Sequence, residues 1–363
     1  MRIAQRMVSR NYRKTLNNSL AKQAASLERS DSGLKFSKLS DNVADGSRAM
    51  HIQEERYQST QHLDNVENLY SEMKSVDSNM DSIHSILQNI QERMLTGMSQ
   101  DYGEDARKVI AKEIASKKDQ ILQFANNQFG GKYLFSGTNN SVAPFSVDAD
   151  GKLAYNGIAV EKIYKDPTDG KYKYDKEVVD NTVTPPTTTI VPTVVPNSED
   201  TYADVGLGLK IANNTNVDTR TAFQVSFSGL TIMGYGEKPN PEFTVGAKGT
   251  KVPTNLYDTL TAVENALDPL NEDALDDLFT QVVNLTDKLG MTRTELGSRM
   301  DFLQRTQSRL EDDIDNMTEL ETNLISSDPA EEAMKMKECE YVWLAVMQLG
   351  SKVLPASLLD FMS

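Results

Sequence analysis

Side chains that catalyse reactions or bind metals are few in this sequence and lie far apart. The three histidines are His51, His62 and His84. None of them has a second ligand four residues away, the spacing that presents two ligands on one helix face. The single cysteine, Cys339, has a glutamate on each side, and nearby carboxylates disfavour the thiolate that a nucleophile requires. We therefore expect surface histidines and a small packing cysteine, and predict neither a metal site nor a catalytic thiol.

Two segments have part of a ligand-binding pattern and lack the rest of it. Residues 206–208 read Gly-Leu-Gly, without the third glycine and the Lys-Ser/Thr pair of a phosphate loop. Residues 148–151 read Asp-Ala-Asp-Gly, which starts like a calcium loop but has no later ligands. Because aspartate and glycine favour turns, a β-turn is the better interpretation. With no group of residues suited to catalysis, the sequence predicts a protein that is not an enzyme and binds no cofactor.

Two long stripes of apolar residues dominate the sequence. In the first, nine residues follow strict 3-4 spacing: Val66, Leu69, Met73, Val76, Met80, Ile83, Leu87, Ile90 and Met94. In the second, one apolar residue recurs every seven positions: Leu289, Leu296, Leu303, Leu310, Met317 and Leu324. A 3.5-residue period specifies a helix packed lengthwise on another helix, so we predict that these two helices are partners. Aromatic residues make up only 7% of the 363 residues, low for one large globular core and typical of long, narrow helical packing.

The middle of the chain has a different period. From residue 132 to about 252 apolar and polar residues alternate, as in residues 223–228, and this period of two is typical of half-buried strands. Asn156-Gly157 reads as the turn of a tight hairpin. Four prolines and six threonines crowd residues 182–196, which predicts an exposed loop, extended rather than folded. The predicted fold class is α+β, with long paired N- and C-terminal helices forming a helical-bundle or coiled-coil rod and an inserted all-β outer domain.

Breaks in these patterns divide the chain into three parts. Residues 1–40 with 330–363 are a terminal coiled-coil region that becomes ordered on assembly, and residues 41–131 with 255–329 are a helical rod core. Residues 132–254 are a β-rich outer domain, in which residues 176–205 form a Pro/Thr-rich insertion or loop. Helix starts support these limits: we expect caps at residues 40–42, at Asn271 and at Asp328-Pro329.

The amino-terminal segment is basic and only weakly amphipathic. Residues 1–38 hold nine Lys/Arg and two Asp/Glu, a net charge of +7, so the remainder of a chain with −15 overall carries −22. A few scattered apolar side chains, at about 1.5–3 kcal/mol each, hardly offset an ordering cost of about 1–2 kcal/mol per residue. We therefore expect this segment to be disordered in the free monomer and to fold against a partner.

Nucleic acid and membranes are less favoured partners for this chain. A basic arm can bind nucleic acid, but Tyr12 is the only ring among its cations that could stack on a base. The first twenty residues contain no continuous apolar run of the kind found in secretory signal peptides. No stretch is apolar over the length that spans a membrane, so we predict no membrane insertion.

Motifs near both ends of the chain resemble those of one protein family. In the amino-terminal part these are residues 32–36 (SGLKF), 40–45 (SDNVAD), 131–138 (GKYLFSGT) and 144–145 (PF). In the carboxy-terminal part they are residues 340–341 (EY), 349–352 (LGSK) and 357–361 (SLLDF). Over roughly residues 1–145 and 255–363 the sequence is similar to the flagellin family of bacterial flagella. The insertion around residues 176–205 has no counterpart in this resemblance.

The resemblance implies a structural subunit of the flagellum, exported unfolded through the flagellar type III apparatus with an export chaperone. The implied partners are further copies in a helical layer, a neighbouring hook-associated protein and flagellin. Because the start of the chain lacks the Leu-Ser-Ser-Gly-Leu run typical of filament flagellins, we expect a secreted adaptor at the hook–filament junction. The apolar faces at both ends are then the predicted assembly interface, with these members: Leu16, Leu20, Leu27, Val342, Val346, Leu349 and Val353.

Three other interpretations stay open at this point. One is a filament flagellin, which is the same class of protein at another position. Another is a coiled coil outside the flagellum, such as a phage-tail or type III translocator-like protein. The third is a nucleic-acid-binding protein that uses the basic arm, which predicts salt-sensitive DNA binding.

Overall fold

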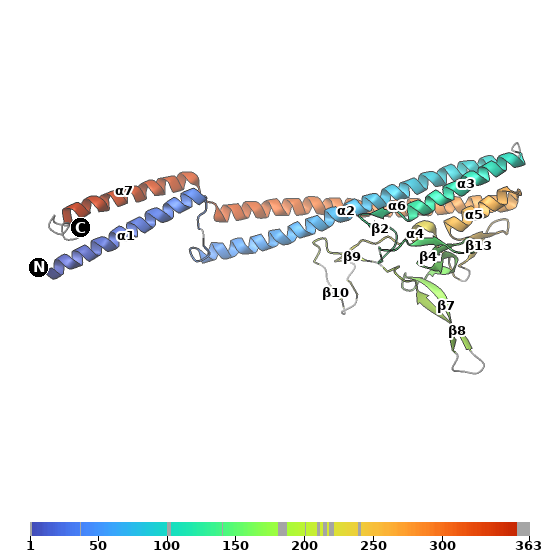
Figure 1. Cartoon of the computed structure of the whole chain (residues 1–363), viewed down its shortest axis with the longest axis horizontal. Coiled ribbons are helices and arrows are strands. Elements are labelled where there is room, and N and C mark those ends of the chain that lie inside the picture. Colours follow the sequence, from blue (N-terminus) through green and yellow to red (C-terminus); the bar gives the residue numbers. More distant parts are fainter. Residues whose placement is uncertain are drawn as a thin grey trace. The chain divides into compact units, whose positions relative to one another are not determined.

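The computed structural model describes residues 2–36, 38–99, 103–139, 141–180, 187–199, 201–208, 211–212, 216–217, 221–238 and 241–353. These residues separate into two compact units. Unit 1 comprises residues 1–61 and 310–363, and unit 2 comprises residues 62–309. Long helices make up most of unit 1, and unit 2 combines long helices with every described strand (Figure 1).

Unit 1 is built from four helical segments. These are α1 (Arg2–Ser32), α7 (Pro329–Val353), the first part of α2 (Val43–Met98) and the last part of α6 (Glu272–Ile325). α1 pairs with α7. The amino-terminal segment, for which we expected disorder in the free monomer, is a continuous helix here and pairs with α7 of the same chain.

The two segments that connect these helices also pair with each other. One links α1 to α2 and the other links α6 to α7. The amide of Lys35 donates to the carbonyl of Ile325 at 2.7 Å, and the amide of Ser327 donates to the carbonyl of Gly33 at 2.9 Å. The segment that links α1 to α2 and the segment that links α6 to α7 are therefore hydrogen-bonded to each other.

The two predicted apolar stripes form the interior between α2 and α6. All nine residues of the first stripe, from Val66 to Met94, are at most 8% exposed. The leucines of the second stripe at positions 289, 296, 303 and 310 are at most 4% exposed, and Met317 and Leu324 are half-buried. The prediction of two helices with 3.5-residue periodicity is confirmed.

Polar contacts fix how α2 and α6 face each other. Arg293 of α6 donates to Asp77 at 3.1 Å and to Asp81 at 2.7 Å, both on α2. Farther along α2, Gln91 donates to the hydroxyl of Thr286 at 2.9 Å. Since the higher number on one helix pairs with the lower number on the other, the helices are antiparallel. Their partnership is the one that the sequence predicts.

Short polar side chains start the helices where the sequence indicates. An asparagine Oδ1 accepts the amide three residues later at 3.2 Å for Asn42 of α2 and at 3.2 Å for Asn271 of α6. The same cap starts α5 (Leu256–Leu267), at 2.9 Å for Asn255. At α7 the carboxylate of Asp328 accepts the amide of Ala330 at 2.8 Å. These bonds satisfy amides that have no partner within the helix.

Two shorter helices complete the helical part of unit 2. α3 (Glu104–Ala125) packs on α5, where the Lys118 ammonium lies 3.2 Å from the Glu264 carboxylate. α3 ends at Ala125, before the pair Gly130-Gly131. The two glycines instead form the turn between two short strands, with φ of 58° and 80°, values that favour glycine.

The strands of unit 2 are short and lie in separate antiparallel sheets. Two sheets have three strands, in the orders β3-β4-β5 and β6-β7-β8, and the others have two. The strands are β1 (Gln128–Phe129), β2 (Lys132–Tyr133), β3 (Phe145–Val147), β4 (Leu153–Tyr155), β5 (Ile158–Ala159), β6 (Ile163–Lys165), β7 (Tyr172–Asp180), β8 (Thr187–Val194), β9 (Tyr202–Ala203), β10 (Ile211–Ala212), β11 (Asn216–Val217), β12 (Phe223–Gln224), β13 (Phe243–Val245) and β14 (Lys251–Pro253). A short helix α4 (Leu230–Met233) and one 3-10 turn at Val160–Lys162 lie among them.

Predictions for the strand region had mixed outcomes. The Asn156-Gly157 hairpin is confirmed, since both residues have positive φ and join β4 to β5. The expectation of an unpaired loop in residues 182–196 is wrong for residues 187–194, which form β8 paired with β7; residues 182–186 lie outside the described part. Pro192 is tolerated in β8 because β8 is an edge strand. The alternating run at 223–228 is a strand only over Phe223–Gln224.

Unit 2 has a well-filled interior beneath these sheets. Phe135 and Tyr155 are fully buried, and the Tyr155 hydroxyl donates to the carbonyl of Phe135 at 3.3 Å. The ring of Phe145 lies 5.1 Å from the ring of Tyr155. Long paired helices with small inserted antiparallel sheets make this an α+β fold, as predicted. The three-part division of the chain remains a prediction.

Candidate assembly interface

α1 and α7 face each other along a seam made largely of small or polar side chains. The helices are antiparallel, since Arg29 near the end of α1 meets Glu332 near the start of α7. On α7 the buried and half-buried positions include Glu332, Met336, Cys339, Trp343, Val346 and Gly350. On α1 they include Tyr12, Leu16, Ser19, Gln23 and Ser26. We call these residues the α1–α7 seam. Their 3-4 spacing is that of two helices packed lengthwise.

The seam brings the two helices close together but buries few large apolar groups. A Cβ added at Gly350 would lie 2.0 Å from the hydroxyl oxygen of Tyr12, so the Tyr12 ring packs directly on the α7 backbone. Ser19 and Ser26 are buried, and their hydroxyl groups have no hydrogen-bond partner. Because such contacts remove little apolar surface from water, the pair gains little hydrophobic stabilisation from its own seam.

One charged contact closes the seam at the end nearest the connecting segments. The Arg29 guanidinium lies 3.2 Å from the Glu332 carboxylate, whose side chain is 5% exposed, and Lys335 lies 3.1 Å from it. Burial raises the pKa of Glu332, but the hydrogen bonds and charges of Lys335 and Arg29 outweigh burial and hold that pKa below 4.5. The carboxylate is therefore ionised at neutral pH and binds α1 to α7.

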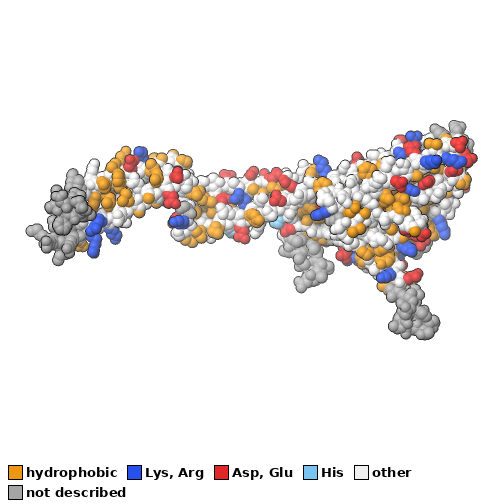
Figure 2. All heavy atoms as spheres, in the orientation of Figure 1, with side chains coloured by type: hydrophobic (Ala, Val, Ile, Leu, Met, Phe, Trp, Pro, Cys, Tyr) orange, Lys and Arg blue, Asp and Glu red, His pale blue; other side chains and the backbone are white. Residues whose placement is uncertain are grey.

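Outside the seam, α7 carries large apolar side chains in contact with solvent. These are Met334, Tyr341, Val342, Leu344, Met347 and Leu349, with exposed fractions between 43% and 69%. We call them the outer apolar face of α7. At 100° per residue Met334, Tyr341 and Leu344 lie on the side of the helix away from the seam, and Val342, Met347 and Leu349 lie on its two flanks. Figure 2 shows hydrophobic side chains gathered over α7. Contiguous exposed apolar surface of this kind is typical of a site for another protein.

The seven predicted interface residues are not in one place. Leu16 and Val346 lie in the α1–α7 seam, half-buried and buried respectively, and Leu20 and Leu27 are exposed on α1. Val342 and Leu349 belong to the outer apolar face of α7. The side chain of Val353 lies outside the described residues. Their role in assembly stays a prediction.

Sequence reasoning missed the seam because it looked for large apolar residues. Of the α7 residues that we predicted for the interface, Val346 is buried against α1, whereas Val342 and Leu349 are exposed. A signal existed, since Glu332, Met336, Cys339, Trp343, Val346 and Gly350 follow 3-4 spacing. That spacing is easily overlooked because glycine and glutamate occupy two of the positions.

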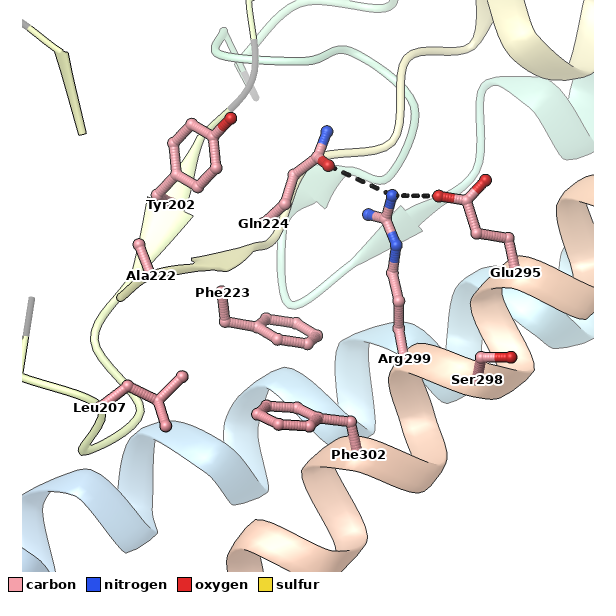
Figure 3. Close-up of a pocket in the computed structure, with 9 residues that line it drawn as sticks. All are labelled: Tyr202, Leu207, Ala222, Phe223, Gln224, Glu295, Ser298, Arg299 and Phe302. Atoms are coloured by element: carbon pink, nitrogen blue, oxygen red, sulfur yellow. Dashed lines mark hydrogen bonds and ion pairs between the residues drawn. The ribbon is translucent and has the colours of Figure 1, made fainter. Parts of the chain in front are cut away.

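Unit 2 contains a cavity of 520 Å³ between α6 and the short strands (Figure 3). Phe223 of β12 and Phe302 of α6 stack with ring centres 5.8 Å apart, and the Arg299 guanidinium bridges Gln224 and Glu295. Besides these five, the lining comprises Tyr202, Leu207, Ala222 and Ser298. These contacts fasten β12 to α6, and the lining contains no nucleophile with a neighbouring base.

The residues considered for chemistry occupy ordinary structural positions. No group of three possible metal ligands occurs among the described residues. The predicted turn at residues 148–151 is confirmed: the carboxylate of Asp148 accepts the amides of Asp150 at 3.0 Å and Lys152 at 2.8 Å. Cys339 is half-buried in the seam. Within the described part of the chain, no helix has the length and hydropathy needed to cross a membrane.

Comparisons with known proteins agree with the motifs at the start of the chain. Residues 3–140 match the family model of the bacterial flagellin N-terminal helical region. The chain is 25% identical over 147 residues to flagellar hook-associated protein 3 of Escherichia coli (strain K12). This match covers 40% of the chain and 46% of that relative, so the chain spans about half the length of the curated relative it matches.

Solved structures share the fold. A protein of Vibrio parahaemolyticus described as a flagellar hook-associated protein has a TM-score of 0.55 at 15% identity, covering 79% of this chain and 100% of its own. The flagellar junction protein FlgL of Legionella pneumophila has a TM-score of 0.46 at 13% identity, covering 76% and 99%. Only the first of these two similarities is high enough to support the fold assignment. Together with the match over residues 3–140, it confirms the resemblance of this chain to the flagellin family.

Proposed function

We propose that this protein is a structural subunit of the bacterial flagellum, an adaptor that joins the hook-associated layer to the flagellin filament. The observation that supports the proposal most is the outer apolar face of α7, which nothing within the described chain covers. Such a surface fits a subunit that completes its packing in an assembly.

The physical reason is a coupling between folding and incorporation. The seam itself buries little apolar surface, so the α1–α7 pair is weakly stabilised in a free chain. Covering side chains such as Tyr341 and Leu349 in an assembly would add about 25 cal/mol for each Å² removed from water. Ordering and stabilisation of the pair would then occur mainly where neighbouring subunits are present.

The partners proposed from this function are copies of the same chain in a helical layer, a neighbouring hook-associated protein, and flagellin. In that arrangement residues 1–40 and 330–363 form the region ordered by assembly, and residues 132–254 form the outer domain. Export through the flagellar type III apparatus with a chaperone, and location at the hook–filament junction, belong to the same proposal. Catalysis plays no part in it.

The nearest rival is a filament flagellin, and deletion separates the two. A strain that lacks a junction protein should still build hooks but should release flagellin into the medium. A strain that lacks its filament subunit should have no flagellin to release. Immunolabelling of the protein on cells gives a second readout, with a single band at the end of the hook expected for the adaptor.

A charge placed on the outer apolar face tests the interface directly. We expect Leu349→Asp to abolish incorporation, because a carboxylate would have to be buried against the next subunit. Met291→Asp is a matched control, since Met291 is 71% exposed on α6 in unit 2. Both variants should keep the helix content of the wild type. If Leu349→Asp cells swim normally and the variant is found at the hook, the outer apolar face is not an interface.

A further inference from the structure

We infer that α1 of one copy docks through a basic stripe onto an acidic stripe of α6 in a second copy. The inference rests on the proposed function, since it requires that copies of the chain assemble. It adds a second contact to the apolar one, made by charged residues that have no ion pair among the described residues.

The basic stripe consists of Arg10, Arg13 and Lys14. All three side chains are exposed, and their spacing of three and four residues puts them on one side of α1. Tyr12 and Leu16 face α7 in the seam, so at 100° per residue the stripe points away from α7. None of the three cations has an ion pair within the described part of the chain.

The acidic stripe consists of Asp312, Asp315 and Glu319 near the end of α6. These side chains are also exposed, and their spacing of three and four residues again makes one face. Leu310 is 4% exposed and belongs to the stripe of α6 that packs on α2, so the acidic stripe lies on the side away from α2. No ion pair to any of the three carboxylates occurs among the described residues.

Like charges on one helix face repel each other, so each stripe would be stabilised by a partner of opposite sign. Some other charged residues of α6 have such partners within the chain: Arg293 contacts Asp77 and Asp81, and Arg305 contacts Asp301. The two stripes match in number and are opposite in sign, and both belong to unit 1. Charge complementarity therefore favours a second copy as the occupant of the α1 face.

Nucleic acid is a poorer occupant for the same basic face. A chain with a net charge of −15 repels a polyanion, and the acidic stripe would add to that repulsion. A second copy instead lets each stripe offset the other, and it leaves an acidic stripe free at one end of the pair and a basic stripe free at the other end for the next copy. Such a contact would determine how successive copies are placed relative to one another.

Charge reversal with complementation tests the inference on the purified full-length chain. One variant carries Arg10→Glu, Arg13→Glu and Lys14→Glu, and the other carries Asp312→Lys, Asp315→Lys and Glu319→Lys. Sedimentation velocity over a concentration series at about 50 mM salt measures self-association, where screening is weak. We expect each variant to associate about tenfold or more weakly than the wild type. An equimolar mixture should recover association, because each reversed stripe then meets its complement.

The matched control carries Lys74→Glu, Lys112→Glu and Lys288→Glu, three exposed lysines of unit 2 without ion pairs in the described structure. It makes the same change in net charge as reversal of the basic stripe. Its association should stay within about twofold of the wild type. Circular dichroism reports whether each variant is folded, and only variants with intact helices can complement each other.

Several outcomes would overturn the inference. These are a wild type that stays monomeric at every concentration, variants that associate like the wild type, or a mixture no better than its components. DNA binding by the wild type that is lost on reversal of the basic stripe would make nucleic acid the occupant instead. The proposed function is judged separately, since labelling of the protein at the hook decides it whatever the sedimentation result.

Discussion

The two units of this protein differ in how many of their large apolar side chains are buried. Unit 2 buries them, from the stripe Val66–Met94 on α2 to Phe135 and Tyr155 under the sheets. In unit 1 the described hydrophobic residues that are buried are Ala49, Leu310 and Val346, while α7 alone exposes six large ones. The same chain thus contains a region whose interior is complete and a region that has its apolar surface on the outside. The difference indicates that unit 2 is stabilised by its own core, and unit 1 by what covers it.

The largest expected effect comes from the same truncation made in both units. Leu296 is fully buried between α6 and α2, whereas Leu349 is 56% exposed on α7. Leu296→Ala should lower the free energy of unfolding by about 2–5 kcal/mol, because it removes buried methyl groups and leaves a cavity. Leu349→Ala should change it by less than about 0.5 kcal/mol. Urea denaturation followed by circular dichroism measures both. Equal losses would mean that the outer apolar face is already packed in the free chain.

Two glycine substitutions compare the packing of the α1–α7 seam with that of α6 in unit 2. Gly350→Ala should weaken the α1–α7 seam by about 1–3 kcal/mol, because the new methyl group would overlap the Tyr12 hydroxyl. Gly290→Ala on α6 has open space around it and should stabilise its helix by about 0.5–1 kcal/mol. The single tryptophan, Trp343, is half-buried in the seam and reports on it by fluorescence. A Gly350→Ala protein whose Trp343 signal melts like the wild type would show that Tyr12 does not pack on Gly350.

Lowering the pH should open the seam before it affects unit 2. The folded-state pKa of Glu332 is below 4.5, so its contact with Arg29 and Lys335 stabilises the seam above about pH 4.5 and is lost as the pH falls below that value. In unit 2 the pKa of Asp166 is lowered to about 2, chiefly by its hydrogen bond from Lys173, so that ion pair persists to lower pH. Trp343 fluorescence and circular dichroism between pH 6 and about 2.5 separate the two events. In Glu332→Gln the acid step of the Trp343 signal should be absent, and its persistence would assign that step to another group.

The smallest expected effect is that of a surface ion pair in unit 2. Arg293→Gln removes the contacts with Asp77 and Asp81 but leaves the apolar interior of α2 and α6 intact. Exposed pairs contribute about 0.2–1 kcal/mol, so the loss should be a small fraction of that caused by Leu296→Ala. Urea denaturation again provides the measurement. A loss as large as that of Leu296→Ala would mean that polar contacts, not apolar ones, hold α2 on α6.

Much of the fold could be predicted from the sequence because its main element is periodic. The 3-4 spacing from Val66 to Met94 identified both the long helix and its buried face, and short polar residues such as Asn42 and Asp328 marked helix starts. The strands were harder, because pairing such as that of β7 with β8 depends on partners distant in sequence. The threonine- and proline-rich composition of residues 187–194 predicts a loop, and only their pairing with β7 shows that they form a strand.

The candidate interface could be predicted only in part, for a physical reason. Sequence patterns show which residues are apolar, but they do not show whether a given apolar face turns toward a partner in the same chain or toward another molecule. Val346 and Leu349 look equivalent in sequence, yet the first is buried against α1 and the second is exposed. Which face of α7 packs on α1 depends on Gly350 of α7 and on Ser19 and Ser26 of α1, because these small residues permit close approach of the two helices.

Amide hydrogen exchange of the full-length protein, alone and in isolated hook–filament junctions, tests the central claim most directly. The account predicts that amides of α1 and α7 exchange fast in the free chain and become strongly protected in the junction. Amides in the unit 2 parts of α2 and α6 should be equally slow in both samples, because their core is complete without partners. Equal protection of α1 and α7 in the free chain and in the junction would contradict the claim that assembly completes unit 1.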